Sequence, residues 1–188
     1  MTDCMEITVS SAEETFGVGE ALGRALEPGS VVALTGELGA GKTVIAKGIA
    51  RGLGIEEEPT SPTFVIINIY ERGGGDEKGE GGEKKALRRG VKRLYHFDLY
   101  RISCIEELEG IGYEDYFFDD EAVAVVEWAE RVKGIFPPYA IRVEIEIPEG
   151  RDNGIVGSAE IGIITKRTIK IMGEEDWLLS FKSMVERA

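Results

Sequence analysis

The feature that most constrains this chain is the glycine-rich segment GELGAGKT at residues 36–43. It matches the phosphate-loop pattern G-x-x-x-x-G-K-[ST] at every fixed position. Glycine lets the backbone curl until several N–H groups converge on one anion, and a following helix adds its positive N-terminal end. Lys42 can then reach the β- and γ-phosphates of a nucleotide, and the Thr43 hydroxyl can bind Mg²⁺. The segment therefore predicts a P-loop ATPase rather than a simple glycine turn.

The neighbouring segments supply the context that such a loop requires. Residues 31–35 (VVALT) form a short apolar run typical of a buried strand, and a helical pattern runs from about residue 42 to residue 53, where Gly54 ends it. Upstream, residues 13–26 have helical spacing after a serine cap. Other segments predict strands at 64–70, 91–99, 122–126, 140–147 and 159–172, and a last helix at about 174–185.

This alternation of buried strands and helices predicts an α/β fold, in the form of a P-loop NTPase-like three-layer sandwich. We expect a parallel core with antiparallel strands added at an edge, because the late strands alternate apolar and polar residues. The length of 188 residues suits a single domain. Residues 73–90 are rich in glycine and charge and predict a flexible loop joining two strands of a hairpin, and residues 149–158 predict an extra turn.

A site that hydrolyses a nucleotide also needs a carboxylate across from the phosphates, usually at the end of a buried strand. Glu127 follows the apolar run at 122–126 and is the first candidate, because a buried acid needs a cation or hydrogen-bond donors. The alternative is an acid at a solvated strand end. Asp98 is the second candidate, although an ordinary surface acid also fits, because Asp98 lies on the polar face of its predicted strand. The only histidine, His96, has no second ligand nearby and is expected to be structural.

Composition excludes several classes of function. The net charge of −13 argues against direct, non-specific nucleic-acid binding, because an acidic surface repels phosphate backbones. The basic run from Lys84 to Arg93 fits either a local contact with tRNA or an acidic partner, or a solvated loop. We see no signal peptide and no apolar run of membrane-spanning length. Cys4 and Cys104 are too few for a disulfide framework, and they also lack the spacing of a metal site. We therefore expect a cytoplasmic protein with reduced thiols and no membrane partner.

Four segments occur in order along the chain: GELGAGKT, TSPTF, HFDLYRI and VEWAE. Together they resemble the TsaE family of bacterial tRNA-modification proteins, also called YjeE, over about residues 7–147. The combination of HFDLYR with EW is more specific than the phosphate loop alone, and residues 106–117 (EELEGIGYEDYF) also look like the family. The family fold is a P-loop α/β sandwich with a mixed sheet, in agreement with the predicted fold.

The resemblance implies roles for individual residues. Asp98 would face the nucleotide and, with Lys42, support hydrolysis, while Thr43 and Glu127 would lie at Mg²⁺. Thr63 would belong to a segment that senses the nucleotide. The full set of residues implied to bind ATP is Leu38, Gly39, Ala40, Gly41, Lys42, Thr43, Thr63 and Asp98, with Ala12, Thr15 and Lys166 on the side of the base.

The resemblance also implies partners. The family works with TsaB and TsaD, and TsaD completes threonylcarbamoyladenosine on the tRNA base beside the anticodon. TsaE-like proteins supply an ATPase cycle, so this protein would act on tRNA only indirectly, through the TsaB–TsaD complex. Alternation along the strand puts Arg101 on the opposite face from Asp98, so no arginine of these motifs is expected at the γ-phosphate. We therefore expect slow hydrolysis without the partners.

Two other functions stay open from the sequence. A small-molecule or nucleotide kinase shares the phosphate loop but needs a basic lid over the phosphates, whereas the basic loop here is rich in glycine. A binding module could hold ATP without turnover, although the presence of Lys42, Thr43, Asp98 and Glu127 together argues for hydrolysis. The chain departs from the family in its long loop at 73–90 and in additions at about 149–158 and 174–185.

Overall fold

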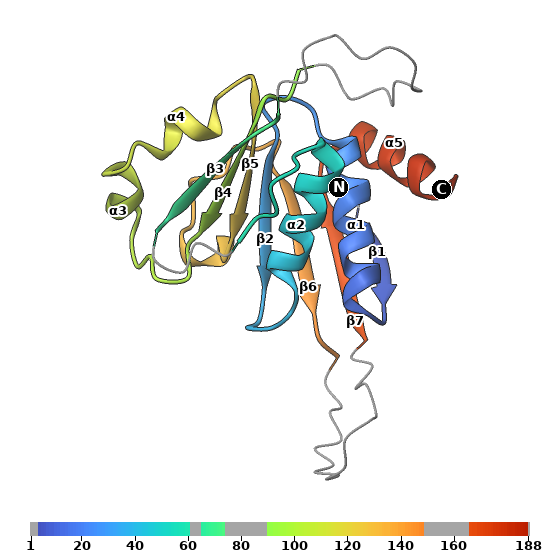
Figure 1. Ribbon diagram of the computed structural model, residues 1–188. Helices are drawn as coiled ribbons and strands as arrows, with labels where there is room; N and C mark the ends of the chain where they lie inside the picture. The colour runs from blue at the N-terminus through green and yellow to red at the C-terminus, as the bar shows by residue number, and fades with distance from the viewer. Residues whose placement is uncertain (1–3, 61–64, 74–89, 149–165, 188) are drawn as a thin grey trace, which may run out of the picture.

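The computed structural model describes residues 4–60, 65–73, 90–148 and 166–187. Figure 1 shows a sheet with helices on both faces. Along the chain the elements are β1 (Cys4–Val9), α1 (Ala12–Ala25), β2 (Val31–Gly36), α2 (Lys42–Leu53), β3 (Ile67–Glu71), β4 (Arg93–Asp98), α3 (Ile105–Glu109), α4 (Tyr113–Phe117), β5 (Ala122–Glu127), a 3-10 turn (Ala129–Arg131), β6 (Ile141–Glu146), β7 (Arg167–Met172) and α5 (Glu175–Val185).

The sheet has the strand order β1-β7-β6-β2-β5-β4-β3. Its centre, β6-β2-β5-β4, is parallel. Antiparallel strands flank this centre on both sides, with β7 and β1 next to β6 and with β3 next to β4. The predicted α/β fold with a parallel core is therefore confirmed. Antiparallel strands occur at both edges of the sheet rather than at one. The β3–β4 hairpin places β3 at one edge, and β7 and β1 lie at the other.

Two apolar clusters, one on each face of the sheet, make the three layers. In the first, Leu22 of α1 and Ile49 of α2 pack with Val32 and Val125, and α5 contributes Phe181. In the second, Leu108 of α3 and Phe117 of α4 pack with Phe97 and Val126. Strand residues point alternately to the two faces, so β5 serves both clusters and its residues from Ala122 to Glu127 are all buried.

Helix α1 packs directly on α2 and so sets the position of the helix that begins at Lys42. The two backbones meet at glycines: a Cβ at Gly48 would lie 2.3 Å from the Phe16 carbonyl oxygen, and one at Gly19 would lie 2.4 Å from the Ile45 carbonyl oxygen. Only glycine permits this approach, because any side chain would overlap backbone atoms that cannot move aside locally.

The boundaries of several strands differ from the prediction. Strand β1 was not predicted, and it pairs with β7 through Ile7 opposite Ile169. Strand β3 begins at Ile67 rather than residue 64, and β4 ends at Asp98 rather than residue 99. Antiparallel pairing of β3 with β4 confirms the predicted hairpin. Residues 74–89 of its loop, the predicted turn at 149–158 and residues 159–165 of the last predicted strand lie outside the described residues.

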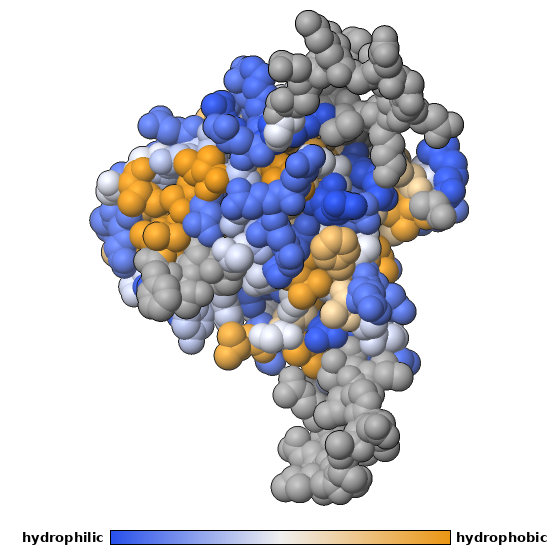
Figure 2. Space-filling model, in the orientation of Figure 1, coloured by the Kyte–Doolittle hydropathy of each residue, from blue (hydrophilic) through white to orange (hydrophobic). Residues whose placement is uncertain are grey.

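Figure 2 shows hydrophilic and apolar residues side by side over α1 and α2, and a patch of apolar residues on the side of α3 and α4. Phe118, directly after α4, is among the exposed large apolar residues there. Within the described ranges, no helix is long and apolar enough to cross a membrane.

Candidate functional site

The glycine-rich segment leaves the carboxyl end of β2 and enters α2 at Lys42, as the motif predicts. Gly41 caps the helix in the left-handed region, with φ of 114°, where other residues are strained. A Cβ at Gly41 would also lie 3.3 Å from the Thr15 methyl group. The backbone therefore requires glycine here, and the positive end of α2 faces the loop.

Lys42, the first residue of α2, is buried. Its Nζ donates to the carbonyl oxygens of Gly36 at 2.7 Å and of Glu37 at 2.9 Å. The same Nζ lies 3.4 Å from the centre of the Trp128 ring, which is a cation–π contact. Burial lowers the pKa of Lys42, and the nearby carboxylates, chiefly that of Glu127, act in the opposite direction. The ammonium group thus lies among oxygen acceptors at the mouth of the loop.

Glu127 ends β5 and meets the first turn of α2. The Thr43 hydroxyl donates to Glu127 Oε2 at 2.9 Å, and Nε2 of His96 lies 2.8 Å from Glu127 Oε1. Strand β5 is the parallel neighbour of β2, with Glu127 opposite Leu34, which brings the strand end beside the loop. Only 2% of the Glu127 surface is exposed, so it is not an acid at a solvated strand end.

Asp98 ends β4, in register with Glu127 on the neighbouring parallel strand. It is partly buried, and its Oδ1 accepts a hydrogen bond from the Tyr100 backbone N–H at 3.0 Å. The predicted polar face of this strand was wrong, because β4 lies inside the sheet between two apolar layers and His96 is 0% exposed. The prediction for Arg101 was also wrong. The strand ends before Arg101, strand alternation no longer applies, and Arg101 lines the same cavity as Asp98.

One cavity of about 530 Å³ brings most of the predicted residues together. It is lined by Leu38, Gly39, Gly41, Lys42, Thr43, Val44, Asp98, Tyr100, Arg101, Glu127 and Trp128. Ala40 is buried within the loop, Ala12 and Lys166 are exposed, and Thr15 is buried with its methyl group close to Gly41. The structure thus does not place these four in the cavity wall, and their role at the nucleotide stays a prediction. Thr63 lies outside the described residues.

Sequence reasoning missed one residue that shapes the site, Arg167, and pointed to a second, Trp128, without giving its contacts. Arg167, the first residue of β7, donates from Nε to the Ala40 carbonyl oxygen at 2.8 Å and so braces the loop from behind. Trp128 has a left-handed backbone, with φ of 59°, and its ring lies against Tyr100 with 4.8 Å between ring centres. The EW motif pointed to Trp128, but no sequence signal separates Arg167 from its neighbour Lys166.

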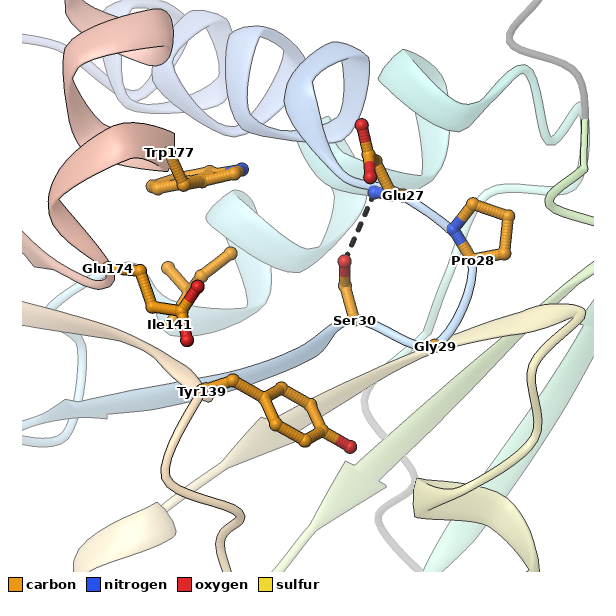
Figure 3. A pocket seen from close by; sticks show the side chains of 8 residues that line it. All are labelled: Glu27, Pro28, Gly29, Ser30, Tyr139, Ile141, Glu174 and Trp177. Atoms are coloured by element: carbon orange, nitrogen blue, oxygen red, sulfur yellow. Dashed lines mark hydrogen bonds between the residues drawn. The ribbon is translucent and has the colours of Figure 1, made fainter.

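A second cavity, of about 350 Å³, lies at the other end of β2, beside Ser30 (Figure 3). Trp177 and Tyr139 face it from two sides, and the Glu27 backbone N–H donates to the Ser30 hydroxyl at 3.1 Å. Because β2 separates Ser30 from Gly36, and no residue of the glycine-rich segment lines this cavity, the predicted phosphate-binding residues lie at the first cavity and not at this one.

Residues 9–154 match the family described as threonylcarbamoyl adenosine biosynthesis protein TsaE. The chain belongs to the TsaE family. Among curated TsaE proteins, that of Treponema pallidum is 38% identical over 143 residues, which cover 76% of this chain and 92% of the relative. That of Haemophilus influenzae is 34% identical over 137 residues, covering 72% and 75% of the two chains. The family predicted from the four segments is therefore confirmed.

A solved structure shares the fold of this chain. The crystal structure of Bacillus subtilis YdiB superposes with a TM-score of 0.66 at 26% identity, and the match covers 100% of this chain and 97% of that chain. The family match includes the glycine-rich segment, Asp98 and Glu127, which are the parts that meet in the first cavity. Strand β7 and helix α5 lie beyond its last residue.

Proposed function

We propose that this TsaE-family protein binds ATP with Mg²⁺ at the glycine-rich segment and hydrolyses it in support of tRNA threonylcarbamoyladenosine biosynthesis. The observation that carries the proposal is the hydrogen bond of 2.9 Å between the Thr43 hydroxyl and Glu127 Oε2. It joins the loop to the end of a neighbouring parallel strand and places a hydroxyl and a carboxylate at one point. These are the oxygen ligands that Mg²⁺ prefers beside nucleotide phosphates.

The donors of the loop fit an anionic ligand. Lys42 Nζ already points to carbonyl oxygens, and phosphate oxygens would take their place as stronger, charged acceptors. The left-handed Gly41 turns the backbone at the positive end of α2, where an anion is stabilised. When bound, Mg²⁺ would neutralise charge on the phosphates, with Thr43 and Glu127 as the residues that hold it.

Asp98 and Arg101 supply the remaining charged groups of the cavity wall. Asp98 ends the strand next to Glu127 and is more exposed than Glu127, so it is the carboxylate suited to orient a water molecule near the phosphates. We therefore assign Glu127 to Mg²⁺ and Asp98 to the hydrolytic step.

The proposed partners are TsaB and TsaD. The net charge of −13 favours docking to a basic surface of a protein complex over direct capture of tRNA, because like charges repel at long range. In this account the protein contributes an ATPase cycle and is not the transferase.

The test is product analysis after incubation with ATP and Mg²⁺, with and without TsaB–TsaD and with candidate acceptors. We expect ADP and inorganic phosphate only, and no product from Lys42→Ala. Lys47→Ala is the matched control, because Lys47 lies on the same helix but pairs at the surface with Glu58. A phosphorylated acceptor would instead show a kinase, and bound ATP without turnover under every condition would show a binding module.

A further inference from the structure

His96, the only histidine of the chain, has no part in the proposed chemistry, yet its position is specific. It lies on β4 opposite Val125 of β5, two residues before Glu127. Side chains at such diagonal positions share one face of a sheet and are within reach when long. The imidazole is 0% exposed, and its Nε2 lies 2.8 Å from Glu127 Oε1. A polar ring is therefore buried in the sheet and directed at one carboxylate.

The contacts of the ring select one of its two neutral tautomers. An ionised carboxylate only accepts hydrogen bonds, so the proton of the contact must lie on Nε2. Nδ1 is buried, and none of the described residues hydrogen-bonds to it. The other tautomer would place two acceptors face to face at Glu127 and would leave a buried N–H without an acceptor at Nδ1, which proteins rarely tolerate.

The same carboxylate is held from its other side. Glu127 Oε2 accepts from Thr43 while Oε1 faces His96, so hydrogen bonds from β4 and α2 fix both oxygens. Without the imidazole, the carboxylate could turn about its last bond and withdraw Oε2 from Thr43. Groups that orient a metal ligand in this way commonly contribute tenfold to a hundredfold in metal affinity.

We propose that His96 is a positioning residue: as the Nε2–H tautomer it holds Glu127 so that Oε2 faces Thr43 and Mg²⁺. The inference rests on the proposed function for the metal, but the tautomer and the contact with Glu127 do not depend on it. A purely structural histidine would stabilise the fold without affecting how nucleotide affinity responds to Mg²⁺.

The first experiment reads the tautomer directly. Because the chain has one histidine, ¹⁵N-histidine labelling of the whole protein gives two ring nitrogen signals, and their couplings to the ring protons identify which nitrogen carries the proton. We expect a single tautomer with the proton on Nε2, and we expect Glu127→Ala to shift the Nε2 signal. A proton on Nδ1, or a mixture in exchange, would overturn the inference whether or not ATP binds.

The second experiment compares ATP affinity in Mg²⁺ with affinity in EDTA. We expect His96→Phe to reduce the gain from Mg²⁺ by about tenfold or more and to leave the affinity in EDTA nearly unchanged. His96→Gln should restore most of the gain, because its amide N–H can reach the place of Nε2–H. In a Glu127→Gln background, His96→Phe should have little further effect on the Mg²⁺ response.

The outcomes separate the two proposals. An equal loss of ATP affinity in Mg²⁺ and in EDTA, or an unchanged gain of affinity from Mg²⁺ in His96→Phe, would show that His96 is only a structural residue. If the ATP affinity of the wild-type protein does not change with Mg²⁺, the proposed metal site is contradicted. The ¹⁵N signals of the His96 ring would still show whether His96 contacts Glu127. Thermal unfolding shows whether His96→Phe folds. If it does not fold, the Mg²⁺ response of His96→Gln and the ¹⁵N signals of the labelled wild-type protein test the inference.

Discussion

Thr43 and Glu127 are 84 positions apart in the sequence, yet the hydroxyl of one donates to the carboxylate of the other at 2.9 Å. Two features produce this contact. Strands β2 and β5 are parallel neighbours, so their carboxyl ends meet at one edge of the sheet, and α2 starts at that edge. The contact joins the phosphate-loop side of the site to its acidic side, and the prediction for Glu127 depends on it directly.

Replacement of Lys42 by alanine should remove most of the affinity for ATP. The ammonium group lies between oxygen acceptors at the mouth of the loop, and losing a charge-assisted contact of this kind costs about 1.5–3 kcal/mol, at least roughly tenfold in affinity. Calorimetry measures the change, with Lys47→Ala as control. An unchanged dissociation constant for Lys42→Ala would place the phosphates elsewhere.

Glu127→Gln should weaken binding of Mg²⁺-ATP more than binding of metal-free ATP. The substitution removes one negative charge from the metal's surroundings, while the contacts of the loop to the phosphates persist. Titrations in Mg²⁺ and in EDTA give the two affinities. Similar losses under both conditions would mean that Glu127 supports the fold of the site rather than the metal.

Nucleotide binding should change the intrinsic fluorescence through Trp128. The Trp128 ring lies 3.4 Å from Lys42 Nζ, so a phosphate that attracts this ammonium group alters the surroundings of the indole. Trp177, the only other tryptophan, lines the second cavity and stacks on Phe181. Trp128→Phe should abolish the change and Trp177→Phe should retain it. The reverse pattern would move the nucleotide to the second cavity.

Gly48→Ala should destabilise the fold by about 1–3 kcal/mol or more, because the new methyl group would lie 2.3 Å from the Phe16 carbonyl oxygen and force α1 away from α2. Gly17→Ala is the matched control on α1, since a Cβ there meets nothing within 4 Å and alanine favours a helix. Urea unfolding measures both. A loss of stability shared equally by the two variants would show that close approach of the helices is not the cause.

Much of the fold and part of the site could be predicted from the sequence. The glycine-rich segment has a strict pattern, and the apolar run before Glu127 is long enough to specify a buried strand. Strand β1 gave no such signal because it is an edge strand, exposed along one side, that pairs with β7 across almost the whole chain. Pairing between distant segments leaves little trace in local periodicity.

The errors at β4 have a related cause. Leu94, His96 and Asp98 make one face of β4 look partly polar, which is typical of a half-exposed strand. Strand order instead places β4 inside the sheet, where a histidine can be buried when it has a hydrogen-bond partner. Arg101 was misplaced because strand alternation was extended past the last strand residue, Asp98. Strand order and the end of a strand are properties of the folded chain, and a local pattern does not contain them.

We propose that this protein has an ATPase cycle governed by TsaB–TsaD. The most direct test is steady-state release of phosphate from Mg²⁺-ATP, measured for the protein alone and with the TsaB–TsaD pair. We predict slow turnover alone, because the Arg101 side chain lines the cavity but donates to the Val65 carbonyl oxygen at 3.3 Å. We predict a marked rise with the partners, since a partner can order the site or add a stabilising charge, and an added arginine contributes roughly 10³–10⁵ in rate. Asp98→Asn should bind ATP yet lose this rise. Equal turnover with and without the partners, or a full rise in Asp98→Asn, would contradict the account.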